Sequence, residues 1–394
     1  MKHLNNFIDV LKSELKFMIH DSGVMLIMLG AIFIYSTLYS LAYHNQILNS
    51  LPIAVIDNSH SGASRAFIRA FDASPNVDVL YSPSDMESAK KLFFERKVYG
   101  VMMIPENFEV NIASNKQAKV ALYADASYFL MYKQTFIAFT STLMDSNVKL
   151  EVSRFMSSGM SKHEATAIAE PVAVNTQVLF NHIGGYATFV MPAIMLLILQ
   201  QTLLLGIGII GGTQREQKLY VNFKDEQNKP FSTLEVLLGK LSAYFIFSVL
   251  ICLAVFGTYY KILGYPVRSE DLQTLLFFVP YILSCSLLGI AISTTFRYRE
   301  TAIIVLVAWS LPFLLISGVS FPKEGIPSFI YNLGQLLPSS SAINGFNRIH
   351  VMGASLQDIA HEYNVMWFLT IIYFIFSYIG LKIRLKREFM IDKK

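Results

Sequence analysis

Residues 183–212 read IGGYATFVMPAIMLLILQQTLLLGIGIIGG, a run without Asp, Glu, Lys or Arg. An α-helix crosses the hydrocarbon core of a bilayer with about 20 residues, so this run is long enough to span a membrane. Soluble domains have roughly a quarter of their residues charged, whereas this chain of 394 residues is 15% charged and 53% hydrophobic. The sequence therefore predicts an integral membrane protein.

Five more uncharged runs of comparable length occur in the chain. They are residues 24–43, 241–260, 272–296, 301–322 and 363–381. Together the six runs predict an α-helical polytopic membrane protein with six transmembrane helices. The two cysteines, Cys252 and Cys285, lie inside these runs, which predicts small buried side chains rather than a disulfide or a metal site.

Lys and Arg are concentrated in four short segments: the amino-terminal flank, the loop after residue 212, the turn at residues 297–299 and the tail after residue 381. With six spans, all four segments lie on the same side of the membrane. Segments rich in Lys and Arg face the cytoplasm. We therefore expect a multi-pass membrane protein with both termini in the cytoplasm.

Apolar residues at helical spacing give residues 1–22 an amphipathic pattern. The apolar face consists of Leu4, Phe7, Ile8, Leu11, Leu15, Met18 and Ile19. Directly before a membrane span, such a helix is expected to lie in the cytoplasmic interface. The first span, residues 23–43, is then an uncleaved anchor, because the leader and the apolar run are both too long for a signal peptide.

Residues 44–182 have ordinary hydrophobicity and predict an external α/β domain. Strand-like runs at residues 53–56, 77–81, 98–104 and 118–123 alternate with helical runs at residues 61–71, 84–97 and 128–170. This alternation is typical of a mixed or parallel sheet. Ser61 is expected to cap the first helix, and Ser84 with Glu87 to form a capping box on the second.

Residues 183–394 contain the second to sixth spans and two longer connections. The first is a polar cytoplasmic loop at residues 211–240. The second, residues 323–362, is rich in proline and contains apolar stretches at residues 333–337 and 343–352 that are too short to span. We expect a re-entrant segment with short helices here, which membranes tolerate only where such a segment packs against protein.

The sequence contains none of the familiar catalytic or nucleotide-binding patterns. It has no G-x-x-x-x-G-K-[ST] phosphate loop, no H-E-x-x-H, no paired cysteine motif and no G-x-S-x-G elbow. Its eight histidines have no metal-ligand spacing. We therefore expect no enzyme activity and no cofactor or metal on this chain.

Polar residues within a span are costly in hydrocarbon and mark either helix contacts or transport pathways. Gln200 and Gln201 lie in mid-span and point about 100° apart, so both cannot face lipid. An interhelical hydrogen bond is the favoured interpretation, and a substrate pathway is the alternative. The fifth span is expected to be interrupted by Ser310, Pro312 and the pair Ser317-Gly318.

Several short motifs occur along the chain: IAVID at residues 53–57 with Ser61, Ser64 and Arg65; IPENF at 104–108; ADAS at 124–127; SGVSFP at 317–322; LP at 337–338; NG at 344–345; and RE at 215–216 with LE at 234–235 and GK at 239–240. In this order and on this topology, they resemble the permeases of ABC transporters of the type-2 export class, in the branch with a large external domain. The chain departs from the family pattern in having Gln217-Lys218-Leu219 where Gly-Thr is usual.

The resemblance implies an exporter permease of the bacterial cytoplasmic (inner) membrane that pairs with a second permease chain. It also implies a separate ABC ATP-binding subunit that carries ATP and Mg²⁺, and in this branch a periplasmic adaptor is common. Under this interpretation the loop at residues 211–240 couples the ATPase to the spans through Arg215, Glu216, Glu235 and Lys240. A pathway or gate would involve Gln200, Gln201, Ser317, Gly318, Pro322 and Pro338.

The branch is associated with efflux of hydrophobic or amphipathic, drug-like compounds. A lipid or polysaccharide exporter shares the mechanism and differs in its cargo. A non-transporting membrane scaffold, whose external domain binds a partner, is the alternative from another class. The Arg215-Glu216 pair ahead of a cytoplasmic helix favours a transporter, because a scaffold does not need it. We expect contacts with membrane lipids and none with nucleic acid.

Overall fold

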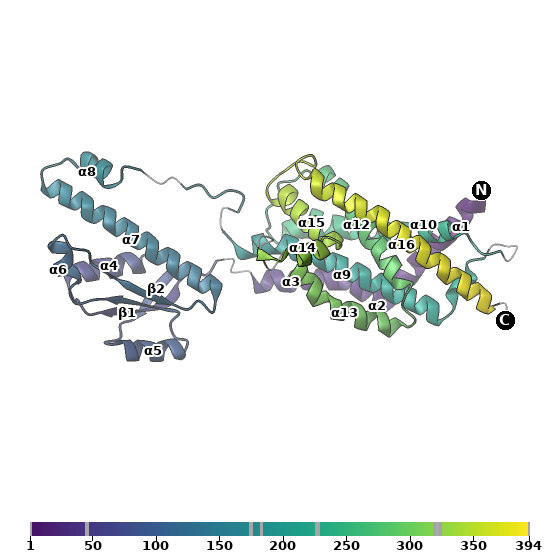
Figure 1. Cartoon of the computed structure of the whole chain (residues 1–394), viewed down its shortest axis with the longest axis horizontal. Helices are drawn as coiled ribbons and strands as arrows, with labels where there is room; N and C mark the ends of the chain where they lie inside the picture. The colour runs from purple at the N-terminus through teal and green to yellow at the C-terminus, as the bar shows by residue number, and fades with distance from the viewer. Residues whose placement is uncertain are drawn as a thin grey trace. The chain divides into compact units, whose positions relative to one another are not determined.

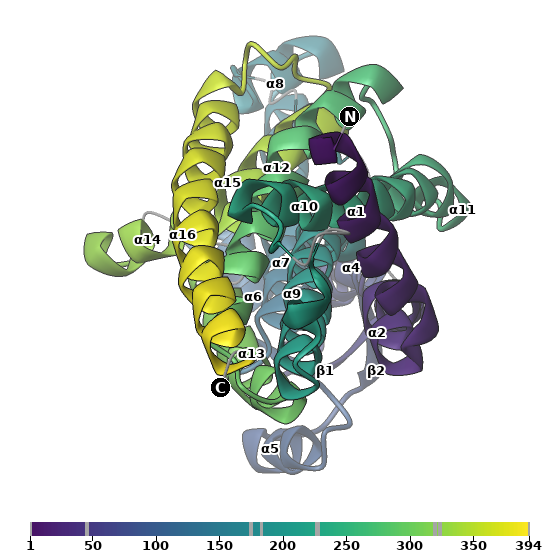
Figure 2. The same ribbon diagram turned by 90° about the vertical axis from the view of Figure 1, so that its right-hand side faces the viewer.

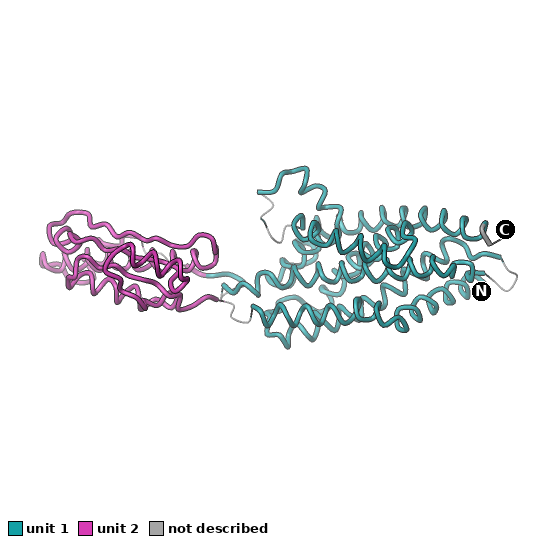
Figure 3. The backbone as a smooth tube through the Cα atoms, turned by 90° about the horizontal axis from the view of Figure 1, so that it is seen from below, with its two compact units in different colours: residues 1–46, 178–394 teal, residues 47–177 magenta. Residues whose placement is uncertain are grey.

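The computed structural model describes residues 2–43, 47–172, 176–181, 184–224, 229–317, 321 and 325–392. The chain divides into two compact units (Figure 3). One unit, residues 47–177, is called the α/β unit here. The other, residues 1–46 with 178–394, is called the membrane unit.

The α/β unit contains a four-stranded sheet in the order β2-β1-β3-β4. Its strands are β1 (Leu51–Asp57), β2 (Val77–Tyr81), β3 (Gly100–Ile104) and β4 (Ala121–Ala124). The first three are parallel, and β4 runs antiparallel to β3. The predicted α/β insert with a mixed sheet is therefore confirmed.

Helices cover both faces of this sheet (Figure 1). They are α4 (Gly62–Asp72), α5 (Met86–Phe94), α6 (Phe108–Ala113) and α7 (Phe129–Ser157), while α8 (Lys162–Ala169) packs against α7. Phe71 of α4 and Phe139 of α7 pack with Ile53 on one face, and Ala89 of α5 packs with Ala54 on the other. Central β1 is therefore apolar on both faces, as parallel strands between helices are.

Of the two helix caps predicted in the α/β unit, one is confirmed and the other is wrong. Ser61 caps α4 and accepts a hydrogen bond from Ser64 N at 3.0 Å. Ser84 does not cap α5. Asp85 is the N-cap and accepts from Ser88 N at 2.7 Å. Ser84 and Asp85 are both good caps, but only the Asp85 carboxylate lies in reach of the third amide of the helix.

The correct cap can be tested in the α/β unit prepared as a fragment of residues 47–177. Asp85→Ala should lower the midpoint of urea unfolding, whereas Asp85→Asn should retain most of the wild-type value, because Asn and Asp cap about equally well. Ser84→Ala is the matched control and should change the midpoint little. A larger loss for Ser84→Ala than for Asp85→Ala would contradict the assignment.

The membrane unit has six helices long and apolar enough to cross a bilayer within the described ranges. They are Ser22–Ala42, Tyr186–Glu216, Thr233–Ile262, Asp271–Ser293, Arg299–Ile316 and Ala360–Met390. In the element labels of Figure 1 these are α2 (Ser22–Met25), η1 (Leu26–Gly30) and α3 (Ala31–Ala42); α9 (Tyr186–Glu216); α10 (Thr233–Cys252), η3 (Leu253–Tyr259) and α11 (Tyr260–Ile262); α12 (Asp271–Ser293); α13 (Arg299–Ile316); and α16 (Ala360–Asp392). The six predicted spans are confirmed.

Helix α9 is the central element of the membrane unit (Figure 2). It contacts α3, α12, α13 and the short helix α15 (Pro338–Phe346). In the most apolar 18-residue stretch of α9, 78% of the residues are buried, whereas in the corresponding stretch of α13 only 11% are buried. Helix α9 is therefore packed within protein, while α13 presents an apolar surface outward.

The observed helices do not end where the apolar runs end. Helix α10 starts at Thr233 and α9 continues to Glu216, because backbone hydrogen bonding persists beyond the hydrocarbon. Ser310 and Pro312 lie inside α13, which remains helical to Ile316, so the predicted interruption at these two residues is wrong. Pro312 lacks only its own N–H, and a membrane helix tolerates that loss.

The connection between the fifth and sixth spans contains α14 (Ser328–Gly334), α15 and the π-helical turn η5 (Asn347–Val351). Every residue of α15 except Asn344 is buried, and the helix packs on α9, α12 and α16. Short helices were predicted in this segment, with other boundaries, and α15 meets the condition that they pack against protein.

Candidate functional site

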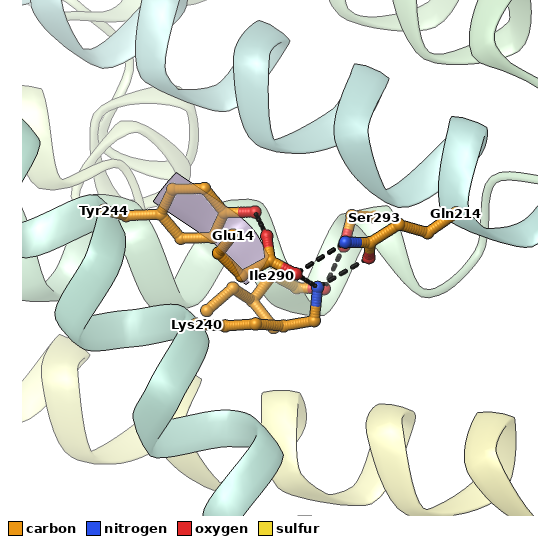
Figure 4. Close-up of polar contacts among 6 residues, drawn as sticks. All are labelled: Glu14, Gln214, Lys240, Tyr244, Ile290 and Ser293. Atoms are coloured by element: carbon orange, nitrogen blue, oxygen red, sulfur yellow. Dashed lines mark hydrogen bonds and ion pairs between the residues drawn. The ribbon is translucent and has the colours of Figure 1, made fainter. Parts of the chain in front are cut away.

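Four polar side chains meet in the membrane unit where α1 (Lys2–His20), α9 and α10 converge (Figure 4). Lys240 Nζ forms an ion pair with Glu14 and donates to Gln214 Oε1 at 2.6 Å. Gln214 Nε2 donates to Glu14 Oε1 at 2.5 Å, and Tyr244 OH donates to Glu14 Oε2 at 2.7 Å. All four are buried. We call these residues the polar cluster.

The charges of the polar cluster are compensated within it. The Glu14 carboxylate accepts from three donors, and the Lys240 ammonium also lies 5.3 Å from the ring centroid of Tyr220 in η2 (Leu219–Asn222). A buried charge without a partner costs several kcal/mol. The cluster is therefore stable only while α1, α9 and α10 are held together.

The first turn of α10 makes a second connection to α1. Ser232 and Glu235 form a capping box, in which Glu235 Oε2 accepts from Ser232 N at 2.8 Å. The same carboxylate accepts from Asn6 Nδ2 at 3.1 Å and bonds His3. Gly239 lets the two backbones approach, because a Cβ there would lie 2.7 Å from Val10. Helix α1 is therefore packed along α10.

A third connection joins the end of α1 to α13. Asp21 caps α2, accepting from Gly23 N at 3.0 Å, and forms a two-point ion pair with Arg299. The Arg299 guanidinium lowers the pKa of the Asp21 carboxyl, so the pair stays charged at neutral pH. Three polar contacts thus hold α1 to the bundle, while its apolar residues Leu4 and Ile19 remain exposed.

Three of the four residues predicted to couple the ATPase point into the membrane unit. Glu235 and Lys240 make the contacts described above, and Arg215 Nη1 donates to Phe296 O at 3.2 Å. Glu216 is exposed. Among the four, Glu216 is therefore available for a partner, and the other three connect the loop to the spans.

The loop between α9 and α10 is compact where it is described, with residues 225–228 outside the described ranges. Lys218 adopts a left-handed backbone with φ 55°, which ends α9 and leads into η2. Phe231 N donates to Phe223 O at 2.9 Å, and the two rings stack with centroids 6.3 Å apart. The loop thus returns directly to the start of α10.

The predicted pathway residues lie in two places. Gln200 Oε1 accepts from Ser339 N at 2.8 Å, at the start of α15, where Pro338 is the first residue. This is an interhelical hydrogen bond of the favoured kind. Gln201 is partly buried, and its side-chain amide has no partner among the described residues. Ser317 is buried and donates to Leu314 O, while Gly318 and Pro322 lie outside the described residues.

Sequence reasoning missed Glu14, Gln214 and Tyr244. A signal for Glu14 was present, because it falls within the apolar stripe of residues 1–22, between Val10 and Met18. An acidic residue at such a position predicts a buried partner. Among the described residues no group of His, Cys, Asp and Glu is arranged to hold a metal ion.

The polar cluster can be tested by removing one charge or both. Glu14→Ala leaves Lys240 buried without a counter-charge and should destabilise the purified chain by about 3–5 kcal/mol. The double variant Glu14→Leu/Lys240→Met should recover most of that loss, because apolar replacements of similar volume are close to neutral. Thermal unfolding in detergent measures both, with exposed Asp9→Ala as control. A double variant no more stable than Glu14→Ala would contradict the pairing.

Comparison with known proteins gives consistent results. A family model described as ABC-2 family transporter protein matches residues 22–379. The chain is 21% identical over 365 residues to the inner membrane transport permease YhhJ of Escherichia coli (strain K12), covering 91% of each chain. It is 22% identical over 311 residues to the probable multidrug ABC transporter permease YbhS of the same organism, covering 77% of this chain and 78% of the other.

Proposed function

We propose that this chain, which belongs to the ABC-2 family of transporter proteins, exports hydrophobic or amphipathic, drug-like compounds across the inner membrane. Family membership makes it a multi-pass membrane permease and confirms the resemblance found in the sequence. YbhS, a distant relative, is named a probable multidrug permease. That name supports a hydrophobic cargo over a polysaccharide.

Permeases of this family lack an ATPase domain and work with ATP-binding subunits, so ATP is bound by the partner. This confirms that the chain is not an enzyme and carries no cofactor of its own. A second copy or a related permease would complete the transporter, and a periplasmic adaptor would extend it. These two partners are part of the proposal.

The structure supports a coupling role for the loop at residues 211–240. Both ends of this loop continue into helices of the polar cluster, because Gln214 belongs to α9 and Lys240 to α10. A force on the loop therefore acts on α1, α9 and α10 together. Exposed Glu216 provides a charge for a polar protein interface. These observations favour a transporter over a membrane scaffold.

The coupling role is tested by charge reversal at the loop. Glu216→Lys should weaken association with the ATPase subunit by at least about tenfold, since juxtaposed like charges cost several kcal/mol. Export and substrate-stimulated ATP hydrolysis of the reconstituted complex should then fall together, while membrane insertion is retained.

The control for that experiment is Glu300→Lys, which reverses the charge of an exposed acidic residue in the first turn of α13 and should leave transport unchanged. Glu235→Lys is unsuitable, because the carboxylate of Glu235 binds α1 within the permease. Wild-type association and transport in Glu216→Lys would exclude this residue from the coupling contact.

We also propose that both termini and the loop at residues 211–240 face the cytoplasm, and that the α/β unit is external. In a variant with Cys252 and Cys285 replaced by Ala, Ser127→Cys should react with an impermeant thiol reagent in intact cells. Asn222→Cys should react only after permeabilisation. Both positions are exposed, so a reversed labelling pattern would refute this orientation.

A further inference from the structure

A basic pocket of about 530 Å³ lies between the ends of α9, α12 and α16. Five cationic residues line it: Arg215, Lys218, Arg297, Arg384 and Arg387. Glu216 and Glu388 are the acidic residues of its lining. The positive excess of the lining indicates an anionic ligand.

Arg384 is the buried member of this group, with 4% of its surface exposed. Its Nη1 donates to Thr294 O at 2.7 Å and to Phe296 O at 3.2 Å, which fixes the guanidinium against the end of α12. Nε and Nη2 have no hydrogen-bond partner among the described residues, although Nε lies 3.9 Å from Glu388 Oε1. Nη2 of this fixed, buried guanidinium therefore lacks an acceptor of the kind that a phosphate oxygen provides.

Three of the other four cations differ from Arg384 in being exposed. Lys218, Arg297 and Arg387 are exposed, and each comes from a different part of the chain. Lys218 contributes to the lining from a left-handed backbone position, with φ 55°. Residues other than glycine seldom adopt this conformation. Accessible cations around one buried guanidinium suit a multiply charged or multi-oxygen group.

One side of the pocket is apolar and belongs to a membrane helix. Ile383 and Gly380 of α16 line it, and Ile383 continues an exposed apolar surface that includes Ile379 and Phe376. All three lie in the span Ala360–Met390. A ligand in this pocket thus has a cationic surface for its head and a lipid-facing helix for an acyl chain, which favours a phospholipid over a soluble anion.

We propose that this pocket binds the phosphate of an anionic phospholipid headgroup, with Arg384 at its buried side and Arg297 and Arg387 at its exposed side. The acyl chains follow α16. Basic pockets between transmembrane helices at the membrane surface recognise such headgroups by charge and shape. The site is separate from the polar cluster. Tyr220 lies between the two, with its ring centroid 5.1 Å from Arg384 Cζ and 5.3 Å from Lys240 Nζ.

The test uses the full chain, purified and delipidated in detergent, with lipid binding measured by native mass spectrometry. Phosphatidylglycerol should bind at least about tenfold more tightly than phosphatidylcholine with the same acyl chains. The double variant Arg297→Gln/Arg387→Gln should lose that preference, because each cation near an anionic headgroup contributes about fivefold in affinity.

The matched control is Lys382→Gln/Lys386→Gln, which removes two exposed cations of the same helix that do not line the pocket. This control should keep the preference for phosphatidylglycerol. Lys218→Gly removes a third pocket cation at a backbone position that glycine adopts freely, so it should weaken lipid binding without loss of thermal stability.

Four results would overturn the proposal. The first is equal binding of the two lipids, and the second is equal effects of the pocket and control variants. The third is displacement of phosphatidylglycerol by millimolar inorganic phosphate, which would make this a site for free phosphate. The fourth is a pocket variant that binds lipid normally but no longer copurifies with the ATPase subunit, which would make the pocket a protein contact.

Discussion

The ion pair between Glu14 and Lys240 constrains the arrangement of the membrane unit, because both side chains are buried. Removing α1 would leave the Lys240 ammonium beside Gln214 and Tyr220 without a counter-charge. Hydrophobic attraction does not fix helix positions in a bilayer, where lipid is as apolar as the helices themselves. A satisfied polar contact with defined geometry can do so. The amino-terminal helix is therefore a structural part of the permease, although the family match begins after it, at residue 22.

Close contacts between the backbone of α9 and its neighbours add to the packing around the ion pair. On α9, a Cβ at Gly211 would lie 2.7 Å from Ser293, and a Cβ at Gly212 would lie 2.7 Å from Tyr298 O. Any larger residue would push away the turn between α12 and α13, which carries Arg297. Small residues serve this purpose in membrane helices generally. The sequence of α9 thus combines large apolar residues that fill the interior with glycines where neighbouring backbones meet it.

The sequence predicted the parts of this structure that depend on local pattern. Long uncharged runs sufficed for six spans, and alternating strand and helix patterns sufficed for the α/β unit. The cap of α5 could not be assigned with certainty, because Ser84 and Asp85 are adjacent and both are good caps. The polar cluster could not be predicted from local pattern, because its residues come from distant parts of the sequence and meet only in the folded structure. The resemblance assigns Lys240 to the coupling contact with the ATPase, and only its proximity to Glu14, more than 200 positions away in the chain, shows that its side chain is instead buried in an ion pair.

Helix α9 carries the two polar contacts that fix α15 and the polar cluster. Gln200 holds the start of α15, and Gln214 belongs to the polar cluster. Fourteen residues separate them, which is about 21 Å along a helix at 1.5 Å per residue. Both lie in the same helix, Tyr186–Glu216, and its proline, Pro192, lies before Gln200. The segment between the two glutamines therefore lacks a proline hinge, and its unbroken helical hydrogen bonding links the two contacts. We expect a displacement of α9 at the polar cluster to reach α15 through this continuous helix.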